Sequence, residues 1–109
     1  MALTYKILGQ SLPAANTYTD LYTVPASTQS ILSTINVCNL TASNVTFRIA
    51  ARRAGTTLTN SNFIAFDTAL SAQDSLGLTL GVTLANTDVI TVFSAQGNVA
   101  FNLFGTEIT

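Results

Sequence analysis

The side chains that most often carry out acid–base or metal chemistry are scarce in this sequence. It contains no histidine, which removes the most common general base and the most common metal ligand. Cys38 is the only cysteine, so neither an intrachain disulfide nor a cluster of thiolate ligands can form. Because Cys38 lies within an apolar run, we expect a small buried side chain rather than a nucleophile. We therefore predict no catalytic residue, no metal ligand and no cofactor.

A pair of carboxylates, as in glycoside hydrolysis, is the remaining route to catalysis. Asp74 and Asp88 are typical turn residues, whose side chains accept hydrogen bonds from nearby backbone amides. The acidic residues stand apart in sequence, at expected loops or strand ends: Asp20, Asp67, Asp74, Asp88 and Glu107. The sequence therefore favours a protein that is not an enzyme, and a carboxylate-pair enzyme is the least favoured hypothesis.

Three arginines form the basic group of the sequence. Arg48 and Arg52 have even spacing on one expected strand, so both should point outward on the same face, and Arg53 begins the next loop. A nucleic-acid site would need further basic residues and exposed aromatic residues nearby, and the sequence supplies neither. We expect these arginines to pair with acids such as Asp67 or Asp74 across a subunit interface, or alternatively to form a solvated face.

Carbohydrate-binding sites on β-proteins generally use exposed aromatic platforms. The sequence has no tryptophan, and its three tyrosines all fall in the first quarter of the chain. Tyr18 and Tyr22 have even spacing, so one strand could present both on the same face. This spacing supports a binding module as an alternative function.

The composition indicates one domain, residues 1–109, with a surface that carries few charges. Hydrophobic residues make up 48% of the 109 residues and charged residues only 8%, with a formal net charge of −1. Soluble domains usually have roughly 25% charged residues. No window approaches the roughly 18 apolar residues of a membrane-spanning helix, so we expect no membrane partner. Neutral polar faces can dock without desolvating charges, which indicates self-assembly or binding to a lattice.

Alternation of apolar and polar residues with a period of two recurs along the chain. The clearest strand is 44–52. We expect Ile64 and Phe66 to point inward from strand 62–70. The last two strands should form a hairpin, because a Gly-containing connection at 95–98 joins them. The expected strands are residues 19–24, 29–40, 44–52, 62–70, 76–84, 89–93 and 99–104.

The long strand 29–40 has apolar residues on both expected faces. Ile31, Ile35 and Val37 share one face, and the other carries Leu32, Cys38 and Leu40. We expect both faces to be partly covered, as by a neighbouring subunit.

About seven or eight antiparallel strands with no covering helix must close sheet against sheet. The expected fold is an all-β, single-domain β-sandwich, with a jelly-roll or an immunoglobulin-like topology. Residues 1–17 are the least patterned, and they form either an N-terminal arm that reaches onto a neighbour or an edge strand. The first residues lack the pattern of a secretory signal, so we expect assembly in the cytoplasm.

Several short segments carry a resemblance that runs along nearly the whole chain. They are LYTVPA at 21–26, STINVCN at 33–39, FRIA at 47–50 and FNLFG at 101–105. In these segments the sequence resembles small virion structural proteins of tailed bacteriophages, particularly those of cyanophages and related marine phages.

The resemblance implies a capsid decoration (cement) protein. Such a protein would form a homo-oligomer, as in trimers at symmetry axes of the head, and would bind the major capsid protein in virions assembled in the host cytoplasm. The alternative that it implies is a tail or baseplate component, including a receptor-binding β-module that uses Tyr18 and Tyr22. We expect contacts at the strand with Leu32 and Leu40, at loop 53–62 and at the N-terminal arm.

Overall fold

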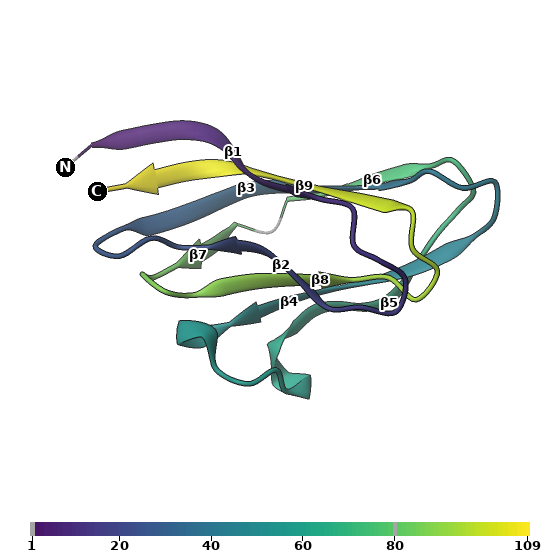
Figure 1. Cartoon of the computed structure of the whole chain (residues 1–109). Helices are drawn as coiled ribbons and strands as arrows, with labels where there is room; N and C mark the ends of the chain where they lie inside the picture. Colours follow the sequence, from purple (N-terminus) through teal and green to yellow (C-terminus); the bar gives the residue numbers. More distant parts are fainter. Residues whose placement is uncertain (1, 80) are drawn as a thin grey trace.

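The computed structural model describes residues 2–79 and 81–109 as two antiparallel β-sheets packed face to face (Figure 1). The strands are β1 (Leu3–Ser11), β2 (Thr19–Thr23), β3 (Gln29–Asn39), β4 (Val45–Arg52), β5 (Phe63–Leu70), β6 (Ser75–Leu78), β7 (Val82–Leu84), β8 (Val89–Phe93) and β9 (Val99–Ile108), with two short 3-10 helices, η1 (Arg53–Gly55) and η2 (Asn60–Asn62). Sheet A has the order β1-β9-β3, and both β6 and β7 pair with the free side of β3. Sheet B has the order β2-β8-β4-β5. The predicted all-β sandwich is confirmed.

The strand order is that of a jelly roll. Four antiparallel pairs are nested along the chain: β4 with β5, β3 with β6 and β7, β2 with β8, and β1 with β9. The first four strands alternate between the two sheets. An immunoglobulin-like sandwich would instead place the first two strands side by side in one sheet. Of the two predicted topologies, the jelly roll is therefore the one that forms.

The core lies between the sheets and is built from the inward side chains of the central strands. Phe47 of β4 and Phe101 of β9 are fully buried and meet edge to face, with ring centroids 6.2 Å apart. The predicted alternation of β4 is confirmed, because Phe47 and Ile49 point inward while Arg48 and Arg52 point outward.

A β-bulge in β3 corrects the predicted faces of that strand. The pairing of β3 with β9 shifts between Leu32 and Thr34, so one extra residue reverses the alternation. Leu32 therefore points into the core together with Ile35, and Ile31 points outward. The prediction that Leu32 and Ile35 point to opposite faces of the strand was wrong, because a period-two pattern contains no signal for the extra residue.

A second bulge, in β5, corrects the prediction for Phe66. Two residues of β5, Phe66 and Asp67, lie opposite the single residue Arg48 of β4, and Asp67 has a φ of +49°. The side chain of Phe66 is 53% exposed instead of pointing inward. Ile64 packs against the core as predicted.

The predicted hairpin of the last two strands does not form. Strand β8 pairs with β2 and β4 in sheet B, whereas β9 pairs with β1 and β3 in sheet A. The connection between them crosses from one sheet to the other, because both sides of each strand already have a partner. The predicted strand 76–84 is divided into β6 and β7 next to Gly81, whose φ is +62°, and Leu80 lies outside the described residues.

The N-terminal segment forms the edge of sheet A. Residues Leu3–Ser11 are strand β1, which pairs with β9 along its length, so this part of the predicted arm is an edge strand of its own sheet. At Gly9 the strand passes close to β2, where a Cβ atom would lie 2.3 Å from the carbonyl oxygen of Leu21. None of the described segments is a helix that is long and apolar enough to cross a membrane.

The buried side chain of Asn39 ties together two loops at one end of the sandwich. Its Nδ2 group donates to the carbonyl oxygens of Ser43 at 2.7 Å and Ser71 at 3.0 Å, and its Oδ1 accepts from the backbone N–H of Thr41 at 2.9 Å. A buried amide with both ends satisfied stabilises the loops, and its removal leaves several backbone groups without partners.

We expect Asn39→Ala to lower the free energy of unfolding by about 2–4 kcal/mol, because buried carbonyl groups lose their donors. Asn36→Ala on the outer face of the same strand should cost less than about 1 kcal/mol. Urea unfolding monitored by circular dichroism measures both variants. Equal midpoints for the two variants would contradict the proposed role of Asn39.

Candidate docking face

The outer face of sheet A carries a group of exposed apolar side chains on adjacent strands. The register aligns Tyr5 of β1 with Thr106 of β9, and Thr106 with Ile31 of β3. In the next row, Ile7 of β1 lies beside Phe104 of β9. These large side chains are 36% to 76% exposed. We call the following residues the apolar face: Leu3, Tyr5, Ile7, Ile31 and Phe104.

The strands of sheet A direct their charged residues away from this face. In β1 and β9 the charged residues are Lys6 and Glu107, which alternate with the apolar face and point to the inner side. Further along the same outer surface, Gln10 donates a hydrogen bond to Asn102 at 2.8 Å. Among the described residues that the register places on the outer side of sheet A, every side chain is uncharged.

The outer face of sheet B carries ion pairs instead. Arg48 makes a two-pronged contact with Asp67, with Nε 2.6 Å from Oδ1 and Nη2 3.1 Å from Oδ2. Arg52 Nη2 lies 2.9 Å from Asp20 Oδ1. The hydrogen bonds from Arg48 hold the pKa of Asp67 below its usual range. Arg48 and Arg52 thus pair with Asp67 and Asp20 within the chain, and the predicted pairing across a subunit interface stays a prediction.

Aromatic rings surround the guanidinium group of Arg48. Its Cζ lies 4.1 Å from the ring centroid of Phe66 and 4.8 Å from that of Phe93, and its Nη1 donates to Tyr18 Oη at 2.7 Å. Tyr18 stacks on Phe93 with centroids 4.4 Å apart. The bulge in β5 creates this cluster, because it places both Phe66 and Asp67 beside Arg48. The rings and donors of the cluster are therefore largely used by contacts within the chain.

The second predicted platform residue, Tyr22, lies on the opposite side of the sheet. A register shift between Asp20 and Tyr22 reverses the alternation in β2, so Tyr22 is buried and shares no face with Tyr18. Its hydroxyl donates to Glu107 Oε2 at 2.5 Å and lies 2.7 Å from Ser30 Oγ, which leaves the serine to act as donor. The prediction that Tyr22 belongs to an exposed interface is wrong.

Glu107 links Tyr22 to the edge strand. Lys6 Nζ of β1 lies 2.7 Å from Glu107 Oε1. The hydrogen bond from Lys6, followed by that from Tyr22, holds the pKa of Glu107 below its usual range. Burial, followed by the hydrogen bond to Glu107, raises the pKa of Tyr22 to about 12. The network therefore fixes β1 to β9 and β2 at neutral pH, and its contacts are structural.

The other predicted contact residues are distributed over separate regions. Leu32 is 2% exposed and belongs to the core, so it cannot contact a neighbour, and the bulge in β3 is the reason. Leu40 is exposed in the loop after β3, and Arg53 is exposed at η1. The sequence contained a signal for the apolar face that the prediction missed: the alternating run Leu3, Tyr5 and Ile7.

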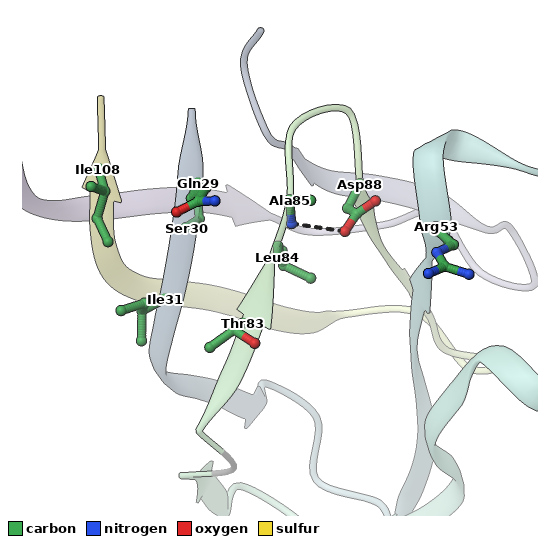
Figure 2. A pocket seen from close by; sticks show the side chains of 9 residues that line it. All are labelled: Gln29, Ser30, Ile31, Arg53, Thr83, Leu84, Ala85, Asp88 and Ile108. Atoms are coloured by element: carbon green, nitrogen blue, oxygen red, sulfur yellow. Dashed lines mark hydrogen bonds between the residues drawn. The ribbon is translucent and has the colours of Figure 1, made fainter. Parts of the chain in front are cut away.

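A hollow of about 450 Å³ opens at the end of the sandwich between β3, β7 and η1 (Figure 2). Asp88 on its wall accepts hydrogen bonds from the backbone N–H groups of Ala85 at 2.9 Å and Ala54 at 2.8 Å, so its carboxylate holds the turn before β8, as predicted. Arg53, the residue before Ala54, lines the hollow on the same side as Asp88, and Ile108 of β9 lines the far side. The described residues contain no group of three or more potential metal ligands.

Comparison with protein-family models, with curated proteins and with solved structures finds no match. The class of the protein therefore rests on its fold and surfaces. Residues 2–79 and 81–109 form a jelly-roll sandwich with one charged outer face and one uncharged outer face that exposes large apolar side chains.

We expect Glu107→Gln to lower the stability at neutral pH, and the difference from wild type to shrink in acid. The pKa of Glu107 is lower in the folded chain than its ordinary value of 4.5, so the carboxylate stabilises the fold above that value. This stabilisation is lost as the pH falls through the folded pKa. Urea unfolding of both proteins between neutral and acidic pH measures the effect.

Asp67→Asn provides the control for this series, because its carboxylate is in an exposed ion pair. Its effect should be smaller and should vanish in high salt, which screens exposed charges. A difference between wild type and Glu107→Gln that stays constant throughout the acid range would show that the ionised carboxylate contributes nothing.

Proposed function

We propose that the chain is a virion structural protein of a tailed bacteriophage, a capsid decoration protein that binds the lattice of the major capsid protein. The observation that carries this proposal is the apolar face, which exposes five large side chains on a surface where the described residues carry no charge. Contiguous exposed apolar surface on a small domain usually marks an interaction site. The resemblance to small phage virion proteins supplies the class of partner.

The distribution of charges favours sheet A over sheet B as the docking side. Burial of the outer face of sheet B would remove Arg48, Asp67, Arg52 and Asp20 from water, and desolvated charges are costly even when paired. Burial of the apolar face involves no such cost and gains about 25 cal/mol for each Å² of apolar surface. We therefore place the capsid-binding side on sheet A.

The jelly roll alone does not select a function, because viral capsid domains, lectins and cupins all use it. A cupin-like metal site would rely on histidine ligands, and the sequence has none. A tail-associated or receptor-binding module is the second candidate, favoured by the exposed rings of Tyr18 and Phe66 on sheet B.

The copy number in purified particles of the phage that encodes the chain tests the location. Quantitative mass spectrometry with labelled peptides should give a number comparable to that of the major capsid protein. A much lower number would assign the chain to the tail instead, and its absence from the particles would contradict a virion role altogether.

Two matched phenylalanine variants test the docking side. Phe104→Ser removes a ring from the apolar face, and we expect it to weaken binding to particles that lack the protein about tenfold, equivalent to roughly 1.4 kcal/mol. Phe66→Ser removes a ring from sheet B and should leave binding within about twofold of wild type. Co-sedimentation with the particles measures both, after circular dichroism has confirmed folding. Equal losses, or a loss only in Phe66→Ser, would refute the assignment.

A further inference from the structure

We propose that strand β1 pairs with β1 of a second copy, antiparallel and centred on Tyr5, to form a two-fold symmetric dimer with one continuous sheet. The inference deepens the proposed function, because it names the partner at one edge of the docking face. It rests on the geometry of the edge and on the side chains of β1, and it can be tested without any capsid.

Strand β1 is the longest regular edge of the sandwich. Its pairing with β9 runs without a shift from Leu3 to Ile7, and the register changes only between Ile7 and Gly9. The opposite edge of sheet A consists of β6 and β7, which have four and three residues. An edge strand leaves alternate N–H and C=O groups without ladder partners, so a long regular edge is a template for another strand.

The two edges of sheet B carry the features that prevent such pairing. Strand β2 has five residues and a register shift between Asp20 and Tyr22. Strand β5 has a bulge at Phe66 and Asp67, and Asp67 forms an exposed ion pair. Bulges, short lengths and charges are the usual means by which proteins protect sheet edges. Residues Leu3 to Ile7 of β1 have no bulge, and the one charged side chain among them, Lys6, points to the inner side and is neutralised by Glu107 at 2.7 Å.

The regular segment of β1 is complementary to itself. In an antiparallel pair centred on Tyr5, the two Tyr5 rings lie opposite each other, and Leu3 lies opposite Ile7 of the second copy. Apolar and aromatic residues that face each other across strands stabilise a sheet. The register uses all of the segment Leu3 to Ile7, which ends where the bulge begins.

Charge also favours this register. Lys6 is the only charged residue of β1, and its Nζ is already held 2.7 Å from Glu107 on the inner side. With Tyr5 at the centre, Lys6 lies opposite Thr4 of the second copy. A pair centred on Lys6 would set two lysines directly opposite each other, which is destabilising.

The dimer enlarges the surface proposed for docking. Pairing at β1 places the two β1 strands in the middle of one sheet, so the apolar faces of both copies become one uncharged surface. Two linked faces bind a repeating lattice more tightly than one, because the second contact becomes intramolecular. Two-fold pairing at this edge gives a dimer, in place of the trimer that the resemblance implies.

Cysteine cross-linking of the full chain tests the register. In a Cys38→Ser background, Tyr5→Cys should form a disulfide-linked dimer, because directly opposite residues of an antiparallel pair have Cα atoms about 4.5–5.5 Å apart, within the range that a disulfide bridges. Leu3→Cys is the matched control, because its two copies would lie about 14 Å apart along the strands. The double variant Leu3→Cys/Ile7→Cys should link again. Equal rates for both single variants, or faster linkage of Leu3→Cys, would overturn the register.

Native mass spectrometry and sedimentation equilibrium of the unmodified chain test the assembly itself. We expect a dimer, and Tyr5→Lys should raise its dissociation constant at least about tenfold, because two lysines would then face each other. A monomer or a trimer of the wild-type chain overturns the proposal. Tyr5 is 76% exposed in the single chain, so this variant should keep the circular dichroism spectrum of folded wild type, while its unfolding midpoint should no longer rise with protein concentration.

The two proposals fail in different experiments. If the chain dimerises through Tyr5 but neither occurs in particles nor binds them, the virion role is wrong and the pairing stands. If the chain is abundant in particles but Tyr5→Cys does not link, the virion role stands and the pairing at β1 is wrong.

Discussion

The arrangement of a few charges on a two-sheet sandwich is the constraint on which the rest of the structure depends. Each outer face of a sandwich must be covered by water or by another molecule. The whole chain has only four basic and five acidic residues. Ion pairs occupy the outer face of sheet B, and Lys6 and Glu107 turn to the inner side of sheet A. The outer face of sheet A is left to neutral and apolar side chains, and it is therefore the side that a protein partner can cover without desolvating a charge.

Two local features keep the charged side chains away from the outer face of sheet A. In β5 the bulge places both Phe66 and Asp67 beside Arg48. The guanidinium group of Arg48 therefore forms an ion pair with Asp67 and lies over the ring of Phe66, all within one chain. At the edge of sheet A, Glu107 receives hydrogen bonds from Lys6 and Tyr22, and this contact holds β1 in place as a regular strand. Without β1, sheet A would lose three of the five large side chains of the apolar face.

The fold class followed from the sequence because period-two alternation is a direct consequence of strand geometry. The inward set of β4 and the turn roles of Asp74 and Asp88 were predictable for the same local reasons. The bulges were not, since an extra residue leaves no mark on composition, yet each one reverses the faces of its strand. For that reason Leu32 and Tyr22 were assigned to an interface, although both lie in the core. The separation of β8 from β9 depends on which strands already flank them, which is a property of the whole fold.

Hydroxyl-radical footprinting of intact particles and of the free chain tests the central claim most directly. The side chains of Tyr5, Ile31 and Phe104 are exposed in the isolated chain and should react readily there, as should Phe66 on sheet B. In particles, the three side chains of the apolar face should become strongly protected, while Phe66 should keep most of its reactivity. Unchanged reactivity of the apolar face in particles, or protection confined to Phe66, would show that the uncharged side of sheet A is not where this protein meets its partners.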